Sequence, residues 1–484
     1  MAYGTMYVPG VTLAELRALE EKTVPRYGVR FEGSANSGDT VHRLYDAAGL
    51  VSGVDTDTET AKNDFDRIYP WSARRRCCGY WNDAGVFVVN AYKGEPGYAE
   101  DGSNGEVWVE HSLFYYKHIY DGEAEEIVIS ARPLADFLPA PIFLGRDGVV
   151  YQKAYTAAYP MATVDGKATS RSGVFGDPHS LNSAVAAART LGERYTVTRT
   201  AEWYTELLYM WVEFATRDLQ SVMAGATNMA CASSHQAVVS ETNVNRIVVT
   251  NAVAEMFVVG QTIGIGTYAG NTSIANKRIV ISIDDYDWSN KAIYFDGDPV
   301  SIEVGNVVFS LAWKLGSCDG VLSSSGSRVS NTSGKYNCIY RGKEGPYGNG
   351  CQHLSDVLIR IEGSGSEDDP RTYTPYFLPD ATKYSGTLTE DYVPLNIQIP
   401  TGNGYVKRLG LDERFPWVQI PCETGTSATT WYSDYYYIAA SRICVARVGG
   451  TCHGGAHCGP VCYNFEKEPS YTQVDNLSSI SYCR

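Results

Sequence analysis

Short runs of alternating hydrophobic and polar residues cover much of the chain and end at Gly, Asp or Asn. Val, Ile and aromatic residues dominate these runs, which is the pattern of β-strands bounded by turns. Strands are predicted at residues 105–121, 125–134, 245–251, 255–266, 277–285, 291–297 and 306–313.

Helical spacing of apolar residues occurs in three further segments. Residues 11–22 repeat leucine at this spacing, and residues 180–195 predict a second helix. Residues 201–225 predict a third, which we expect to stop at Gly225. Its apolar stripe is predicted to face the core and consists of Trp203, Leu207, Trp211, Phe214 and Leu219. Together, the helices and strands predict an α+β fold class.

The distribution of helix and strand signals along the chain predicts three regions. Between residues 235 and 313 only strand signals occur, and small polar stretches of the kind that tolerate insertion flank them. We therefore expect an inserted all-β domain at 235–313 within a host domain formed by residues 104–234 and 314–484. Residues 1–103 are expected to serve attachment or assembly.

The net charge of −15 disfavours binding to a phosphate backbone or an anionic membrane. The densest basic run, Arg74 to Arg76, is expected to be a solvated turn. No apolar run is long enough to span a bilayer. The expected partners therefore exclude nucleic acid and membrane insertion. The first residues lack the features of a signal peptide, so we expect synthesis in the cytoplasm and reduced thiols among the 12 cysteines.

Residues 447–465 concentrate metal-ligating side chains between glycines: Cys452, His453, His457, Cys458 and Cys462. Structural zinc sites usually space paired ligands two to four residues apart, whereas these form adjacent pairs. We therefore expect no metal and no cofactor, with a disulfide staple as an open alternative. The chain has no P-loop, no G-x-S-x-G elbow and no H-E-x-x-H helix, so it is not expected to be an enzyme.

Two segments resemble a known family. Residues 337–359, NCIYRGKEGPYGNGCQHLSDVLI, resemble the Y-R-G-x-E-x-x-W-G-N core of formylglycine-enzyme-like C-type lectin folds, with Tyr347 in place of the usual tryptophan. The tail, DYYYIAASRICVARVGGTCHGGAHCGPVCYNF, is similar to the end of phage tail-fibre and tail-tip proteins of this fold. It also resembles the variable proteins of diversity-generating retroelements. The resemblance implies a C-type lectin-like domain at the C-terminus.

In that family, fixed glycines hold a backbone whose diversified side chains face a ligand. The resemblance therefore implies a displayed surface with side chains that point to solvent. Tyrosines would border it, since Tyr provides amphipathic contact area at low entropic cost. The predicted ligand-binding residues are Tyr435, Tyr437, Ala439, Ile443, Cys444, Thr451, Cys452, His453, His457, Cys458, Val461 and Cys462.

The resemblance implies a receptor-binding protein of a phage tail, located in the virion. Its expected partners are a bacterial surface protein or glycan, other tail proteins, and further copies of the same chain in a trimer. Two alternatives stay open. One is a copper oxidase of the formylglycine-generating type that would use Cys458 or Cys462 together with Cys483, and the other is a purely structural virion protein.

Overall fold

The computed structural model describes residues 23–52, 63–319, 333–439 and 442–484. Strands account for 39% of the structure and helices for 11%. The α+β prediction is therefore wrong, and the fold is β-rich; a C-type lectin fold is not excluded. The helix predicted at residues 11–22 lies outside the described residues.

The two longer helices are shorter than predicted. Helix α2 (Leu181–Ala188) begins at Ser180, whose side chain accepts from the Ser183 N–H in a capping box. Helix α3 (Thr200–Phe214) ends because Ala215 adopts the left-handed conformation, with φ 50°. A short helix, α4 (Asn251–Ala254), lies elsewhere. No helix within the described residues combines the length and the apolar character that crossing a bilayer requires.

Two antiparallel sheets contain strands from both sides of residue 104. The first has the order β2-β1-β7-β6-β8 and the second the order β4-β3-β5-β9. The chain before residue 104 thus shares its sheets with the chain after it. The strands are β1 (Arg26–Glu32), β2 (Val41–Tyr45), β3 (Arg75–Trp81), β4 (Phe87–Tyr92), β5 (Glu106–Ser112), β6 (Tyr115–Asp121), β7 (Ala124–Ser130), β8 (Leu138–Pro139) and β9 (Lys153–Ala157).

The largest sheet is built from the C-terminal part of the chain, with the order β24-β23-β22-β28-β29-β27-β25-β26, and β30 pairs with β22. The strands are β22 (Cys351–Glu362), β23 (Thr372–Phe377), β24 (Val393–Pro394), β25 (Gly404–Asp412), β26 (Phe415–Thr424), β27 (Tyr435–Ile438), β28 (Ile443–Gly449), β29 (Gly459–Phe465) and β30 (Asn476–Leu477). Three small pairs complete the body: β10 (Ala162–Val164) with β11 (Lys167–Thr169), β12 (Tyr195–Val197) with β31 (Ile480–Tyr482), and β20 (Ile339–Tyr340) with β21 (Lys343–Glu344).

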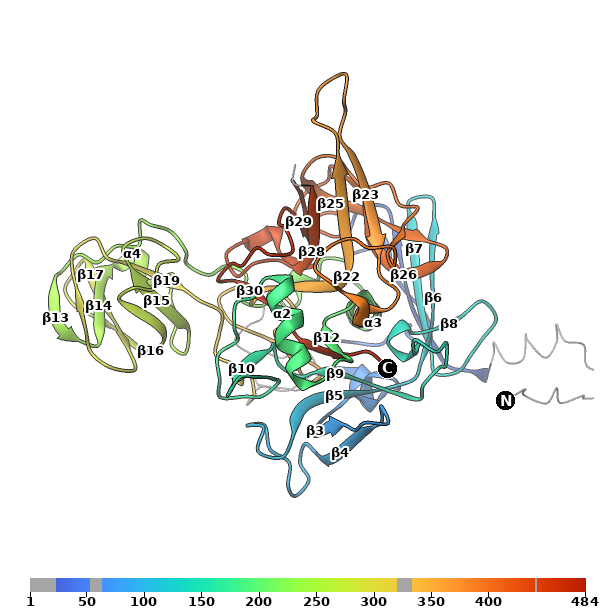
Figure 1. Ribbon diagram of the computed structural model, residues 1–484, viewed down its shortest axis with the longest axis horizontal. Coiled ribbons are helices and arrows are strands. Elements are labelled where there is room, and N and C mark those ends of the chain that lie inside the picture. Colours follow the sequence, from blue (N-terminus) through green and yellow to red (C-terminus); the bar gives the residue numbers. More distant parts are fainter. Residues whose placement is uncertain (1–22, 53–62, 320–332, 440–441) are drawn as a thin grey trace, which may run out of the picture.

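A separate module stands apart from this body (Figure 1). It contains the sheet β14-β17-β16-β15-β19 and the pair β13-β18, and it has its own hydrophobic core. Its strands are β13 (Glu241–Val244), β14 (Arg246–Thr250), β15 (Thr262–Gly266), β16 (Ala275–Asp285), β17 (Asn290–Phe295), β18 (Val300–Ile302) and β19 (Val307–Ser310). The strands predicted at 105–134 and in the module are therefore confirmed for most of their length. The strand predicted at 255–266 is wrong for residues 255–261, because only β15 (Thr262–Gly266) forms there.

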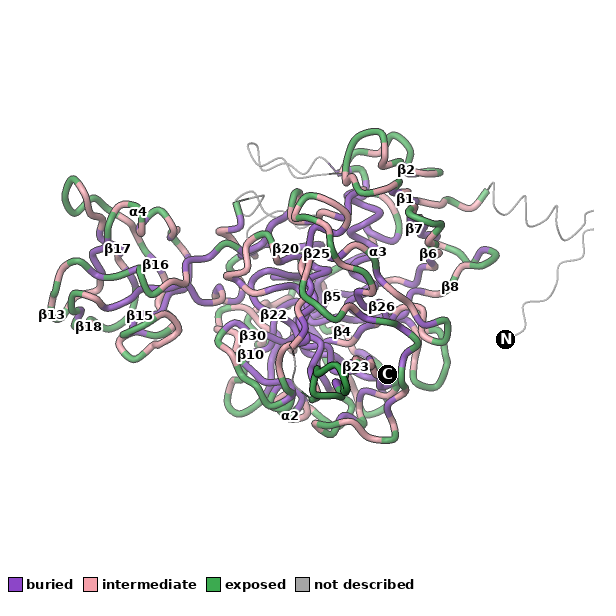
Figure 2. Tube along the Cα trace, turned by 90° about the horizontal axis from the view of Figure 1, so that it is seen from above, coloured by how far each residue is buried: buried purple, intermediate pink, exposed green. Residues whose placement is uncertain are grey.

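Helix α3 lies among buried segments of the body (Figure 2), and its residues from Glu202 to Phe214 are all buried. Its predicted apolar stripe is confirmed as core, since Trp203, Leu207 and Trp211 are at most 3% exposed. Arg74 in turn forms a bidentate pair with the buried Glu206 of α3 at 2.7 and 2.9 Å. The prediction of a solvated basic turn is therefore wrong for Arg74 and for Arg76, which are both buried against carboxylates from distant segments.

Candidate functional site

The C-terminal segment supplies the middle of the largest sheet. Strand β28 pairs antiparallel with β22 and β29, while β27 pairs parallel with β29. Cys444, Ala446 and Val448 of β28 face one core, and Val445 faces another. This strand is covered on both sides, so accessible side chains come from its neighbours and from the turn at 450–458.

A cluster of aromatic rings lies where β25, β27 and this turn meet. We call it the tyrosine–histidine cluster; it consists of Tyr405, Tyr435, Tyr437 and His457. The His457 ring stacks on Tyr435 with centroids 4.1 Å apart and an interplanar angle of 12°. The hydroxyl of Tyr437 lies 2.6 Å from His457 Nδ1. All four rings are partly exposed, so they form a platform that a planar or apolar group can contact.

An open cavity of about 310 Å³ adjoins this platform. Tyr437 and His457 form part of its wall, which thus continues from the aromatic cluster. Its size is at the lower end of the range for small-molecule sites. The lining residues are Cys351, Tyr437, Arg447, Gly450, Thr451, Gly454, His457, Cys458, Cys462, Asn464, Glu466, Lys467, Tyr471 and Gln473.

Two glycines allow the chain to close tightly around this cavity. Gly450 has φ +74°, and a Cβ there would lie 2.5 Å from Cys458 Sγ. Gly459 has φ +121°, and a Cβ would lie 2.0 Å from Asp434 Oδ1. Asp434 is fully buried and accepts from the Val461 N–H at 2.6 Å. Close approach of neighbouring atoms therefore requires glycine at both positions.

His457 and the thiols of Cys458 and Cys462 in the cavity wall are uncharged. Burial lowers the pKa of His457, so its ring is uncharged at neutral pH. Burial, reinforced by neighbouring thiols, raises the pKa values of Cys458 and Cys462. Both are therefore thiols, and the Cys458 S–H lies 2.9 Å from the Thr451 carbonyl oxygen. Thiols are weak nucleophiles, which favours contact over chemistry.

The predicted residues divide into two groups. The expectation that all of them face solvent is wrong for Cys444, Cys452, Cys458, Val461 and Cys462, which are at most 2% exposed. These positions fall on a central strand pair and an inward turn, which the sequence pattern could not reveal. Of the five, Cys458 and Cys462 still line the cavity. The partly exposed residues are Tyr435, Tyr437, Ala439, Ile443, Thr451, His453 and His457.

Several lining residues were missed by the sequence analysis. Tyr405 reaches the cluster because β25 pairs with β27, with Tyr405 opposite Tyr435. Lys467, Tyr471 and Gln473 come from the irregular segment after β29. No local motif marks these positions. Arg447 also lines the cavity, is buried, and donates to Asn464 Oδ1 at 2.6 Å.

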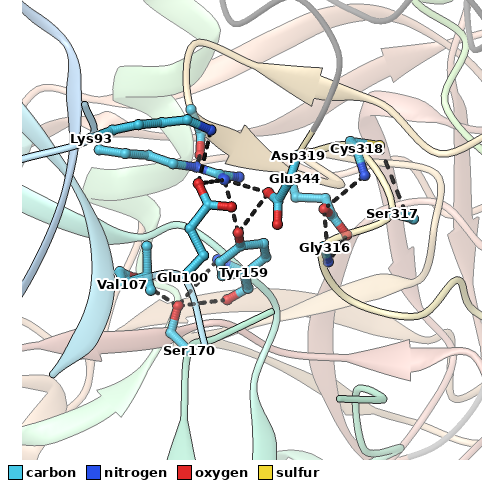
Figure 3. Close-up of polar contacts among 12 residues, drawn as sticks. Lys93, Glu100, Val107, Tyr159, Ser170, Gly316, Ser317, Cys318, Asp319 and Glu344 are labelled. Atoms are coloured by element: carbon cyan, nitrogen blue, oxygen red, sulfur yellow. Dashed lines mark hydrogen bonds and ion pairs between the residues drawn. The ribbon is translucent and has the colours of Figure 1, made fainter. Parts of the chain in front are cut away.

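Two further polar clusters occur in the body. Glu100, Asp319 and Glu344 turn toward one interior region, together with Tyr159 (Figure 3). The Arg76 guanidinium bonds to both Glu100 and Asp319. The second cluster consists of Cys452, His453 and Asp475. Among the described residues it is the one group of three or more Cys, His or carboxylate donors close enough to share a metal ion.

Comparison with protein-family models and with curated proteins found no match to this chain. The site is therefore interpreted from its own geometry.

Proposed function

We propose that the chain is a ligand-binding protein that recognises a bacterial surface protein or glycan as part of a phage tail. The proposal combines the resemblance of residues 337–359 and 434–465 with one structural observation. That observation is the open cavity of about 310 Å³ beside the partly exposed tyrosine–histidine cluster. Trimeric display in the virion, which multiplies weak contacts, and diversification of the surface belong to the same proposal.

The chemistry of the surface supports binding without reaction. Aromatic rings that are half exposed provide large contact area and can stack on sugar rings or apolar side chains. Lys467 and Glu466 at the cavity supply hydrogen-bonding groups of both charges. The ligand should therefore combine an apolar or planar face with polar groups around it.

Binding of labelled, purified protein to a panel of bacterial cells and to a glycan array tests this proposal. On any target that binds, Tyr435→Ala and Tyr437→Ala should each weaken binding by about tenfold or more, as for residues at the centre of an interface. Tyr268→Ala is the matched control, because Tyr268 is 58% exposed but belongs to the inserted module. Equal losses in all three variants, or no binding to any target, would count against the proposal.

A further inference from the structure

The turn at 450–458 meets the base of the inserted module. The Met229 N–H donates to the Cys452 carbonyl oxygen at 2.9 Å, just before the module begins. The Cys452 side chain packs with Ala226, Met229 and Trp313, from both sides of the module. The turn that carries His457 is thus joined to both chain segments that hold the module.

At this junction three donor atoms of different residues converge. Cys452 Sγ lies 3.6 Å from His453 Nδ1 and 3.3 Å from His453 Nε2, and Nδ1 lies 3.8 Å from Asp475 Oδ2. The three donor atoms lie within 4.8 Å of one another. Ligands of a tetrahedral zinc ion, with zinc–sulfur and zinc–nitrogen bonds of about 2.3 and 2.0 Å, are separated by about 3.4 to 3.6 Å. The separation of 3.6 Å between Cys452 Sγ and His453 Nδ1 is close to these values, whereas the 3.8 Å between His453 Nδ1 and Asp475 Oδ2 has to shorten slightly when the ion binds.

The other ring nitrogen of the histidine is also suitably placed. His453 Nε2 lies 3.3 Å from the backbone carbonyl oxygen of Ser310, at the end of β19. A histidine that binds a metal through one nitrogen commonly donates its other N–H to a carbonyl or carboxylate, which fixes the ring. Metal binding through Nδ1 therefore leaves Nε2–H to donate to Ser310.

The Asp475 carboxylate is buried with one oxygen unpaired in the described part of the chain, which is independent evidence for a bound cation. Asp475 is 2% exposed, and its Oδ1 has no hydrogen-bond partner among the described residues. A divalent cation would balance one thiolate and one carboxylate, and so offset the cost of burying these groups.

We propose that Cys452 Sγ, His453 Nδ1 and Asp475 Oδ2 bind a zinc-class divalent cation, with water at the fourth position. The cation would fix the turn at 450–458 against the base of the module. This proposal does not depend on the identity of the ligand at the tyrosine–histidine cluster. It differs from the expectation of a metal-free chain, because the third donor, Asp475, lies outside the cysteine-rich segment 447–465.

Cobalt titration of the chelator-treated full chain tests the site. One Co²⁺ per chain should bind, with a thiolate-to-cobalt charge-transfer band in the near ultraviolet and the visible bands of tetrahedral cobalt. Cys452→Ser should remove the charge-transfer band. Asp475→Asn, which keeps the side-chain shape, should weaken Zn²⁺ binding in a chelator competition by at least about tenfold.

Cys422→Ser is the matched control, because Cys422 is a partly buried free cysteine on β26, outside the cluster. It should leave both the spectrum and the affinity unchanged. Zn²⁺ should also raise the Tm of the wild-type chain and slow proteolysis within the turn, and at the same Zn²⁺ concentration both effects should be smaller in Asp475→Asn. The proposal is overturned if the wild-type chain takes up no Co²⁺ or gives no thiolate band. It is equally overturned if Asp475→Asn binds Zn²⁺ as tightly as the wild type; both results stand even if Cys452→Ser fails to fold.

Discussion

Neighbouring arginines in β3 and before it meet very different environments. The guanidinium of Arg74 is buried against Glu206 of α3, while Arg75 is half exposed and pairs with Glu95 at 3.1 Å. Arg76 is buried again and bonds to Asp319 and Glu100. The sequence shows only a run of like charge. Carboxylates far away in sequence determine which of the three arginines are buried and stabilise the fold.

Substitution of adjacent arginines should therefore have unequal effects. Arg74→Met leaves Glu206 as a buried charge without its partner and should lower the free energy of unfolding by about 3 to 5 kcal/mol. Arg75→Met removes an exposed pair and should cost no more than about 1 kcal/mol. Urea denaturation of both variants measures the difference, and equal effects would contradict the burial seen here.

The backbone at Gly459 lies very close to the side chain of Asp434. Gly459→Ala combines an unfavourable φ with a clash against the buried Asp434, and should destabilise the chain by at least about 2 kcal/mol. Gly425→Ala is the matched control: its φ is +111°, but no atom lies within 4 Å of the added Cβ. Thermal unfolding should show the larger loss for Gly459→Ala. Similar losses would mean that the clash is relieved by a small shift.

Among the elements, strands were easier to predict than the end of α3. Alternation with period two is encoded locally, so most of the strand segments at 105–134 and in the module were identified correctly, the exception being residues 255–261. Helix α3 stops eleven residues before Gly225 for a tertiary reason. The chain turns at Ala215 and brings the buried Arg217 to the carbonyl oxygen of Gly33, beside β1. No feature of residues 201–225 alone encodes that contact.

The hairpin β20–β21 should make stability depend on pH through Glu344. This carboxyl accepts from the Gly316 and Cys318 N–H groups, and Asp319, Glu100 and Arg76 face the same region. Burial, with a smaller contribution from Asp319, raises the pKa of Glu344 to about 8. The folded state thus holds a proton between about pH 4.5 and 8 that the unfolded state has lost.

The free energy of unfolding should therefore decrease as pH rises through this window. Glu344→Gln keeps a neutral side chain of the same shape and should flatten that part of the profile. Burial alone would raise the pKa of Glu100, but bonds from Asp319 and Lys93 and the charge of Arg76 lower it to about 2, so its effect falls at more acidic pH. Urea titrations at pH 5 to 8.5 check the slope, with the exposed Glu362→Gln as control. An unchanged slope in Glu344→Gln would exclude this carboxyl as the source.

Only part of the candidate site of the whole molecule could be predicted from the sequence. The segment 435–462 was identified from its resemblance, and Tyr435, Tyr437 and His457 do meet there. Tyr405 and Tyr471 join from other segments through strand pairing and chain return. The sequence does not show which strands pair, so it does not show which side chains of segment 435–462 point inward. For this reason the burial of the cysteines was not predicted.

The inserted module should be separable from the body. Its ends lie side by side, because the Ser310 N–H donates to the Ala230 carbonyl oxygen at 2.6 Å. Its sheet surrounds a core of its own, which includes Ile247, Val249 and Ile293. Replacement of residues 233–308 by a short Gly/Ser linker should therefore spare the core around α3.

We expect the shortened chain to unfold cooperatively and to keep Tyr437-dependent binding, because the tyrosine–histidine cluster lies entirely in the body. Residues 233–311 produced alone should show a thermal transition of their own. Near-ultraviolet circular dichroism and calorimetry on both fragments test this. Loss of folding in the shortened chain would instead make the module a structural part of the body, and loss of binding without loss of folding would assign ligand contacts to the module.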